Sequence, residues 1–296
     1  MHIAISGSSG LVGSALCSSL PGHQVTRLVR SDAGQHEILW DLEQGRVETE
    51  KLESVDAIVH LAGENLSEGR WNASKKEAIR HSRVEGTRLL SDALAKLSGK
   101  PPIFICASAI GYYGNRGHQV CDERTAPGGD FLADVCKKWE TATRPAAEAG
   151  LRVVNLRIGV VLSKSGGALA KMLFPFKVGV GGQIGNGDQF ISWIVLDELI
   201  NVILFCLEQE SLEGPVNAVS PHPVTNREFT KTLGKVLSRP TMLPLPGFAA
   251  RLAFGEMADA LLLSSTRVAP NKLEENGYRF AFPQLEPSLR HELLKS

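Results

Sequence analysis

The stretch HIAISGSSGLVGSAL, residues 2–16, decides the fold of this chain. Its apolar start, residues 2–6, predicts a strand, and residues 11–20 have the apolar pattern of a helix. The turn between them carries three glycines in a GxxGxxG spacing, Gly7, Gly10 and Gly13. Glycine is needed where the backbone approaches a pyrophosphate closely, and the amides that open the following helix attract phosphate. The stretch therefore predicts a dinucleotide-binding turn; the alternative is an ordinary glycine-rich turn.

Strand and helix patterns alternate through the first half of the chain, which predicts a parallel sheet covered by helices on both faces. The predicted strands are residues 2–6, 23–29, 36–40, 56–62, 102–108 and 152–158, and the predicted helices are residues 11–20, 75–97 and 133–149. The fold class is therefore α/β, a doubly wound parallel sheet of the Rossmann type. We expect a dinucleotide-binding domain over residues 1–164 and a smaller, mostly helical C-terminal lobe over residues 165–296. The lobe is discontinuous, because a strand and a helix near residues 190–220 are expected to return to the sheet.

Composition sets broad limits on the ligand and the compartment. The chain has 296 residues, 43% of them hydrophobic, and 32 lysines and arginines balance 32 aspartates and glutamates. A chain without net charge has no general attraction for nucleic acid or an anionic membrane, and no apolar run reaches the roughly 20 residues of a spanning helix. Five widely spaced cysteines without a CxxC pair argue against a disulfide framework. We expect a cytoplasmic protein with a small-molecule substrate, and the sequence leaves its oligomeric state open.

The second predicted strand ends in LVRSD, which places Arg30 where an acidic residue would bind the ribose hydroxyl of NAD. A cation at that position suits the additional 2′-phosphate of NADP. The alternative is a solvated arginine at a strand end, and Asp32 lies close by. The pattern favours NADP(H) as the cofactor.

Several short motifs together resemble the extended short-chain dehydrogenase/reductase superfamily, which contains the nucleotide-sugar epimerases. They are GSSGLVG at 7–13, WDL at 40–42, VHLAG at 59–63, RVEGTRLL at 83–90 and SAIGYYG at 108–114. Closer details resemble an atypical branch of epimerase family proteins, YfcH-like in bacteria. These details are LAGEN, RWN, GGDF, KWE, LRIGVVL, KVGVGGQIGNGDQFISWI and a tail with GYRFAFP. The resemblance covers almost the whole chain and implies a Rossmann fold that binds a nicotinamide cofactor.

Carried over by position, the resemblance implies a set of cofactor-binding residues. They are Gly7, Ser8, Ser9, Gly10, Leu11, Val12 and Gly13 in the first turn, and Arg30, Asp41, Leu42, Leu61, Ala62, Gly63, Glu64, Arg83, Ser108 and Gly159 further along. Arg30 would meet the 2′-phosphate, and Asp41 and Leu42 would lie near adenine. Arg83 stands where the superfamily has an asparagine, so a cation is available there for a phosphate or an anionic substrate group. The other basic residues of that helix, Lys75, Lys76 and Arg80, are interpreted as a solvated face.

The usual proton donor of the superfamily is missing from this sequence. Hydride delivery to a carbonyl creates an alkoxide, which these enzymes protonate with the tyrosine of a YxxxK motif. None of the three tyrosines has a lysine four residues later. When Glu140 is aligned with the glutamate of the superfamily's catalytic helix, Leu132 takes the tyrosine position and Cys136 the lysine position. The second serine of the SSxxVYG motif falls on Ala109, with Ser108 retained at the first.

Two other residues are candidates for catalysis. Ser108 and Tyr112 lie at the end of the fifth predicted strand, where ligands bind in this fold, and Arg116 is expected to stabilise a phenolate. The alternative is that these residues only shape the pocket. Cys136 is interpreted as a small buried residue rather than a nucleophile, because no feature of the sequence activates it. The eight histidines show no metal-ligand spacing, so no metal site is predicted.

The glycine-rich segment of residues 178–193 resembles the part of the superfamily fold that closes over the substrate. A structural loop is the equal alternative. The resemblance places Gln189, Trp193 and Asn217 at the cleft. The segment contains no basic residue, which speaks against a nucleotide-sugar substrate.

The sequence thus predicts an NADP(H)-binding oxidoreductase that transfers hydride to or from an unknown small substrate. A non-catalytic NADP(H) sensor is the first alternative, since intact cofactor motifs stand beside a missing proton relay. A nucleotide-sugar epimerase is the second alternative, and it requires an acid or base that the sequence does not supply.

Overall fold

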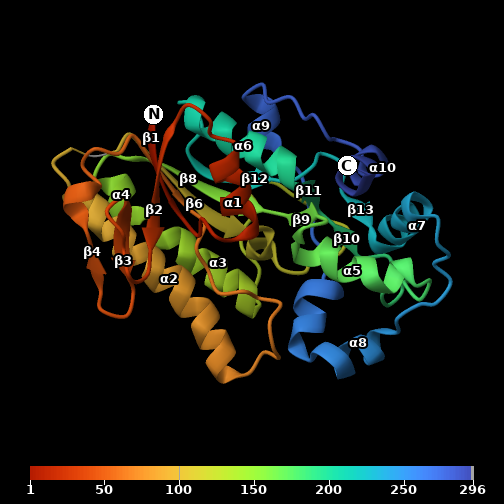
Figure 1. Cartoon of the computed structure of the whole chain (residues 1–296). Helices are drawn as coiled ribbons and strands as arrows, with labels where there is room; N and C mark the ends of the chain where they lie inside the picture. Colours follow the sequence, from red (N-terminus) through yellow and green to blue (C-terminus); the bar gives the residue numbers. More distant parts are fainter. Residues whose placement is uncertain (100, 295–296) are drawn as a thin grey trace.

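A sheet of eight strands forms the centre of the computed structural model, which describes residues 1–99 and 101–294 (Figure 1). In their order across the sheet, the strands are β12 (Gly214–Ala218), β8 (Arg152–Ile158), β6 (Ile103–Ala109), β5 (Ala57–His60), β1 (His2–Ser6), β2 (Gln24–Val29), β3 (Glu37–Asp41) and β4 (Arg46–Val47). All neighbours are parallel except β3 and β4. The strand order reverses between β1 and β5, so their carboxyl ends flank the crevice in which such folds bind ligands. The predicted fold class is confirmed.

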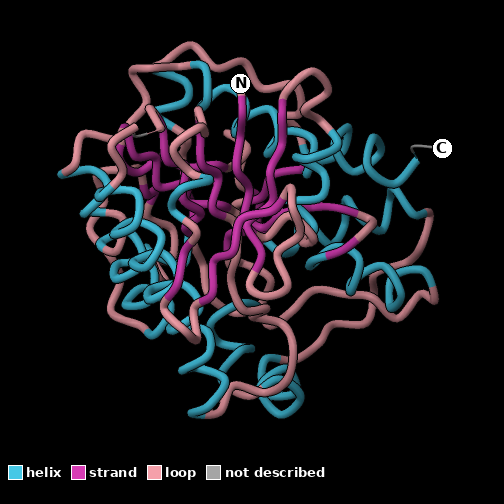
Figure 2. Tube along the Cα trace, turned by 60° about the vertical axis from the view of Figure 1, so that its left-hand side comes forward, coloured by secondary structure: helices cyan, strands magenta, loops and turns pink. Residues whose placement is uncertain are grey.

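Helices cover both faces of the sheet (Figures 1 and 2). One face carries α1 (Leu11–Ser18) and α6 (Leu196–Glu208), and the other carries α2 (Ala73–Lys96), α3 (Phe131–Thr141) and α4 (Arg144–Glu148). Successive residues of a strand point to opposite faces, so Ile3 and Ile5 pack with α1 and α6 while Ala4 packs with α2 and α3. These two cores hold the strand ends in fixed positions.

The predicted helix of residues 133–149 is divided into α3 and α4. Pro145 has no amide hydrogen to donate to Thr141, and its ring would clash with that carbonyl group, so α3 ends there. The start of α3 is capped by Asp130, whose Oδ1 accepts the amide hydrogen of Ala133 at 2.9 Å. The other predicted strands and helices of the first half are present, with ends displaced by a residue or two.

The rest of the chain builds a further core beside the sheet. Its strands and helices are β9 (Val160–Ser163), α5 (Gly167–Lys177), β10 (Phe190–Ile191), β11 (Trp193–Val195), β13 (Val224–Thr225), α7 (Asn226–Leu237) and α10 (Leu285–Leu294). The helix α8 (Gly247–Phe254) and the π-helix η3 (Ala258–Leu262) contribute no residue to this core. Smaller elements are η1 (Thr49–Lys51), η2 (Ile110–Tyr113), β7 (Val120–Cys121), β14 (Arg267–Val268) and α9 (Asn271–Glu275). The expected domain division after residue 164 stays a prediction.

The α8 segment reaches back to the dinucleotide half of the molecule (Figure 1). Lys76 at the start of α2 forms an ion pair of 2.5 Å with Glu256, just after α8. The guanidinium group of Arg70 donates hydrogen bonds to the carbonyl oxygens of Leu252 and Ala253. These contacts fasten the loop that precedes α2 to the C-terminal part of the chain.

A buried hydrogen-bonded pair joins the ends of β1 and β5. Ser6 Oγ accepts the amide hydrogens of Leu61 and Ala62 at 3.1 and 3.3 Å. Its own hydrogen is therefore donated to Nδ1 of His60 at 2.6 Å, which leaves the ring neutral with its hydrogen on Nε2. Within the described part of the chain Nε2 has no hydrogen-bond partner, and the ring lies 5.1 Å from that of Trp40. Burial lowers the pKa of His60 from 6.5 to about 4.

His60 should make the fold sensitive to acid. Its pKa in the folded protein lies below its ordinary value of 6.5, so the unfolded chain binds the proton first, and stability is lost as the pH falls from 6.5 toward 4. We expect this group alone to lower the free energy of unfolding by about 2 kcal/mol between pH 7 and pH 5. In urea unfolding at both pH values, His60→Gln should lose less stability than the wild type, whereas exposed His23→Gln should lose as much. Equal losses in all three proteins would contradict the assignment.

Candidate cofactor and substrate site

The turn between β1 and α1 is shaped by backbone contacts that leave no room for side chains. Gly7 has φ +68°, and a Cβ atom on it would lie 2.8 Å from the amide nitrogen of Ala62. A Cβ atom on Gly13 would lie only 2.2 Å from the carbonyl oxygen of Gly7. Gly10 donates its amide hydrogen to that same oxygen at 3.0 Å. The three predicted glycines are thus brought together in one close-packed turn.

The other predicted residues of the turn surround these glycines. Ser8 is half-buried and Ser9 is exposed. Leu11 is the first residue of α1 and packs against Gly166, while Val12 packs against the core below the sheet. No acidic side chain lies in the first turn of α1, so its free amide groups can face a phosphate.

Arg30, Asp41 and Leu42 lie at the carboxyl ends of the neighbouring strands β2 and β3. Arg30 directly follows β2 and is exposed. Asp41 Oδ1 accepts the amide hydrogens of Glu43 and Gln44 at 2.9 and 3.0 Å, so this carboxylate closes the turn into β4. Leu42 lies beside Trp40 against α2. The structure brings these residues to the same sheet edge as the glycine turn, and their contact with adenine stays a prediction.

The chain leaves β5 through Leu61, Ala62, Gly63 and Glu64, which pass beneath the glycine turn. Glu64 donates its amide hydrogen to Ser82 Oγ at 3.0 Å, and its carboxylate forms an ion pair of 2.5 Å with Lys75. The protein itself therefore neutralises Glu64.

Arg83 of α2 lies against this segment. A Cβ atom on Gly63 would be 3.2 Å from the Cζ atom of Arg83. The guanidinium group is stacked over Trp139, with Cζ 5.1 Å from the ring centroid, and donates a long hydrogen bond of 3.4 Å to the carbonyl oxygen of Ile79. Burial lowers the pKa of Arg83, while the nearby Cys136 and Glu64 act in the opposite direction. A partly buried cation is thus present next to the predicted cofactor path.

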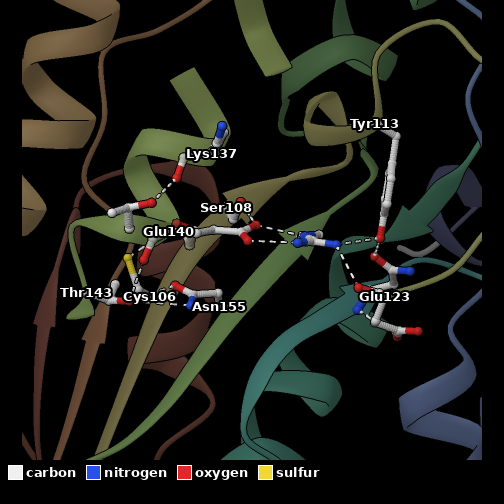
Figure 3. A network of polar contacts seen from close by, with 12 residues as sticks. Cys106, Ser108, Tyr113, Glu123, Lys137, Glu140, Thr143 and Asn155 are labelled. Carbon is white, nitrogen blue, oxygen red and sulfur yellow. Dashed lines mark hydrogen bonds and ion pairs between the residues drawn. The ribbon is translucent and has the colours of Figure 1, made fainter. Parts of the chain in front are cut away.

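Ser108 belongs to a buried network of charges at the end of β6 (Figure 3). Its Oγ donates a hydrogen bond of 2.7 Å to Glu140, and the guanidinium group of Arg157 donates to both oxygens of that carboxylate at 2.8 Å. The Arg157 and Glu140 side chains are 3% and 13% exposed. Burial lowers the pKa of Arg157, but its hydrogen bonds and ion pair with Glu140 outweigh burial and raise it overall. Ser108 therefore holds a carboxylate in place.

Tyr113, rather than Tyr112, is hydrogen-bonded into this network (Figure 3). The Tyr113 hydroxyl donates to Asn217 Oδ1 at 2.6 Å and accepts from Arg157 Nη1 at 3.0 Å. Burial raises the pKa of Tyr113. The ring of Tyr112 lies under the Arg157 guanidinium group, 3.5 Å from its Cζ atom to the ring centroid. Arg116 donates to main-chain carbonyl oxygens, including that of Tyr113, so it is not placed to stabilise a phenolate.

A cavity of about 320 Å³ opens where the first turn of α3 faces α8 and η3. Trp71 and Phe131 line it with their rings edge to face, 5.7 Å apart between centroids. Leu132 lies on the same wall, so the cavity is apolar at this point. On the opposite side, Asp259 is paired with Arg251 at 2.8 Å. The cavity offers an aromatic wall and a charged rim.

Cys136 lies one helical turn beyond Leu132 and is buried. Burial raises the pKa of this thiol to about 12, and the nearby Glu140 raises it further while Arg83 opposes it. Because the thiolate is the nucleophilic form, a thiol with this pKa is unreactive at neutral pH. The interpretation of Cys136 as a small buried residue agrees with this environment.

Three residues expected at the cleft have structural contacts instead. Gln189 donates to the carbonyl oxygens of Ile184 and Leu262, Trp193 is fully buried, and Asn217 accepts from Tyr113. All three side chains are buried, which contradicts their expected placement at the cleft. A Cβ atom on Gly159 would lie 2.7 Å from the carbonyl oxygen of Ser192, so this position is close-packed, and its contact with the cofactor stays a prediction.

Several cavity residues were not singled out from the sequence, among them Trp71, Phe131, Glu256 and Asp259. Trp71 and Phe131 stand inside the family motifs RWN and GGDF, so attention to the aromatic residues of those motifs would have found them. Glu256 and Asp259 belong to the C-terminal tail and carry no motif. Only the folding of α8 and η3 onto α2 brings them to the site.

The described residues contain no group of three His, Cys, Asp or Glu side chains that could hold a metal ion. In the same part of the chain, no helix has the length and apolar character needed to cross a membrane. All five cysteines have free thiols.

The sheet order and the glycine turn define an NAD(P)-binding Rossmann protein of the extended short-chain dehydrogenase/reductase class. Comparison with protein families narrows this class. The chain belongs to the NAD dependent epimerase/dehydratase family, whose model matches residues 3–218. A further family model, described as a domain of unknown function, matches residues 245–292.

Relatives share this architecture over nearly the whole chain. An epimerase family protein from Mycobacterium tuberculosis is 46% identical over 281 residues, which cover 94% of this chain and 93% of that protein. The crystal structure of the human epimerase family protein SDR39U1 with NADPH has a TM-score of 0.91 at 33% identity and covers 100% of both chains. The nucleoside-diphosphate sugar epimerase from Corynebacterium glutamicum has a TM-score of 0.82 at 37% identity, covering 99% of this chain and 58% of that one.

The buried pair of Arg157 and Glu140 should be essential for stability. Glu140→Gln would leave the Arg157 guanidinium group buried without its counter-charge, so we expect the free energy of unfolding to fall by about 3–5 kcal/mol. Glu148→Gln breaks the exposed pair with Arg144 and should change it by no more than about 1 kcal/mol. Urea unfolding of both variants tests this, and similar small effects would show that the buried network is not structural.

Proposed function

We propose that the protein binds NADP(H) along the carboxyl ends of β1 and β5 and transfers hydride to or from a small organic substrate in the cavity. The close approach of Gly7 to Ala62 is the observation that carries this proposal, because it keeps side chains away from the place where a pyrophosphate would lie. The residues present fit such a cofactor: glycines form the turn, and the free amides of α1 face it. When bound, the nicotinamide group would supply or accept the hydride.

The preference for NADP over NAD rests on Arg30. Its exposed guanidinium group follows β2 directly, where a cation matches the charge of a 2′-phosphate. The related human protein SDR39U1, whose structure was solved with NADPH, supports the same cofactor.

The proton that accompanies the hydride needs a source other than the superfamily's tyrosine, because Leu132 occupies that position. Ser108 and Tyr112 are the proposed catalytic residues. Tyr112 is the candidate donor, since the hydroxyl of Tyr113 is already bound to Asn217 and Arg157. Ser108, whose hydroxyl donates to Glu140, would act on the substrate through its oxygen lone pairs.

A non-catalytic NADP(H) sensor is the main alternative. The observation that favours it is the engagement of Ser108 and Tyr113 in structural hydrogen bonds beside an apolar Leu132. In that case the contacts of α8 with Arg70 and Lys76 would report cofactor binding through movement of the C-terminal lobe.

A nucleotide-sugar epimerase is the second alternative. The likeness to the nucleoside-diphosphate sugar epimerase from Corynebacterium glutamicum favours it. Against it, segment 178–193 of this chain has no basic residue to bind a nucleotide diphosphate.

The composition and the cysteines support a type of ligand and a cellular compartment. Balanced charge supports a small-molecule ligand rather than nucleic acid or a membrane surface. The free thiols support a reducing, cytoplasmic compartment.

Arg30 should determine the choice between NADPH and NADH. Loss of a charged hydrogen bond to the 2′-phosphate would weaken NADPH binding by about 10-fold to 100-fold and leave NADH binding unchanged. Equilibrium titration of Arg30→Ala with both cofactors measures this ratio. Arg27→Ala, which removes an exposed arginine from the same strand, is the matched control. The NADP assignment would be contradicted by an unchanged ratio of NADPH to NADH affinity in Arg30→Ala. Equal binding of both cofactors by the wild type would contradict it as well.

Catalysis itself can be separated from sensing by a screen of carbonyl compounds for NADPH oxidation. If the protein is an enzyme, Tyr112→Phe should lower turnover by about 100-fold or more while NADPH affinity stays the same. Ser108→Ala should lower turnover as well. Tight NADPH binding without turnover of any compound would favour the sensor instead.

A further inference from the structure

Arg83 brings to the site a positive charge without a direct ion pair in the described part of the chain, although the carboxylate of Glu64 lies near enough to favour it. Within residues 1–99 and 101–294 no carboxylate forms an ion pair with its guanidinium group, which is stacked over Trp139 and bound to a carbonyl oxygen at 3.4 Å. The carboxylate of Glu64 is already paired with Lys75 at 2.5 Å. Burial raises the pKa of Cys136 to about 12, so this neighbour is an uncharged thiol at neutral pH.

The position of Arg83 determines which half of a bound dinucleotide would lie next to it. Its Cζ atom would lie 3.2 Å from a Cβ atom on Gly63, the residue that follows the contact of Gly7 with Ala62. It is also stacked over Trp139 of α3, the helix whose first turn carries Leu132 into the cavity wall. We consider a cofactor whose pyrophosphate lies at the glycine turn and whose nicotinamide ring lies at the cavity. Arg83 is then next to the nicotinamide half of that cofactor.

The two oxidation states of the cofactor differ by one charge in that half. The oxidised nicotinamide ring carries a positive charge, the reduced ring is neutral, and the phosphates are the same in both. A fixed cation beside the ring repels its oxidised form, and this repulsion grows as the effective dielectric constant around the two charges falls. Selectivity between the two forms follows if the cation lies beside the ring.

We propose that Arg83 makes this site selective for the reduced cofactor, NADPH over NADP⁺. The inference rests on the proposed function, because it requires the cofactor to lie along the glycine turn. It adds a direction to that function: NADPH is retained and NADP⁺ is released, which suits a reductase, and equally a sensor that responds to the ratio of the two forms.

A contact between Arg83 and a phosphate would give a different result. Both oxidation states carry the same phosphates, so a phosphate contact strengthens the binding of both forms equally. Selectivity, rather than affinity, is therefore the quantity to measure.

The test is the ratio of the Kd values for NADP⁺ and NADPH, measured by direct titration of the full chain without substrate. We expect the wild type to bind NADPH at least about tenfold more tightly than NADP⁺. Arg83→Gln should bring the ratio close to one, and Arg83→Lys, which keeps the charge, should largely preserve it. Arg88→Gln removes another arginine of α2, one bonded to the carbonyl oxygen of Thr141 at 3.5 Å, and should keep the wild-type ratio.

A wild-type ratio near one overturns the inference without any variant, so the test does not depend on the folding of Arg83→Gln. Equal weakening of both forms in Arg83→Gln also overturns it, in favour of a phosphate contact. In these two outcomes the proposed function stands, because the cofactor still binds. If neither form binds to the wild type, the proposed function fails together with the inference.

Discussion

The close approach of Gly7 to the backbone after β5 is the constraint on which the rest of the structure depends. A Cβ atom at this point would lie 2.8 Å from Ala62, so only glycine allows β1 to turn there into α1. Ser6 and His60 fix the same junction from within the core, because Ser6 Oγ on β1 is bonded to His60 at the end of β5 and to the amides of Leu61 and Ala62 after it. The strand order reverses at this junction. The glycine turn therefore lies at the same edge of the sheet as the first amides of α1 and the carboxyl ends of the neighbouring strands.

A second constraint shapes the region between β6 and α3. Burying the charges of Arg157 and Glu140 is unfavourable unless hydrogen bonds replace the lost water, and Ser108 together with the two-pronged guanidinium contact supplies them. The same bonds engage Ser108, one of the two residues proposed for catalysis. The cavity lies further along, at Leu132 and Trp71.

The parts of the molecule that could be predicted from sequence are those with local signals. The glycine spacing and the alternation of strands and helices predicted the fold class, while the break at Pro145 was hidden by a helical pattern that continues on both sides. The resemblance transferred positions but not side-chain directions, so Gln189 and Trp193 were placed at the cleft although both are buried. The partnership of Ser108 with Arg157 through Glu140 could not be predicted, because it joins separate elements that only the folded sheet brings together. The cofactor contacts of the glycine turn, Arg30 and Arg83 stay predictions.

The cavity takes its lining from segments far apart in the chain, and this has a consequence for biosynthesis. Every strand of the central sheet is complete at Ala218, whereas Arg251, Asp259 and Leu263 are made later. Domains generally fold from the N-terminal end as the ribosome releases them. The nascent chain therefore contains the whole glycine turn and its sheet before the cavity exists. A chain that terminates early would retain the glycine turn but would lack the cavity beside it.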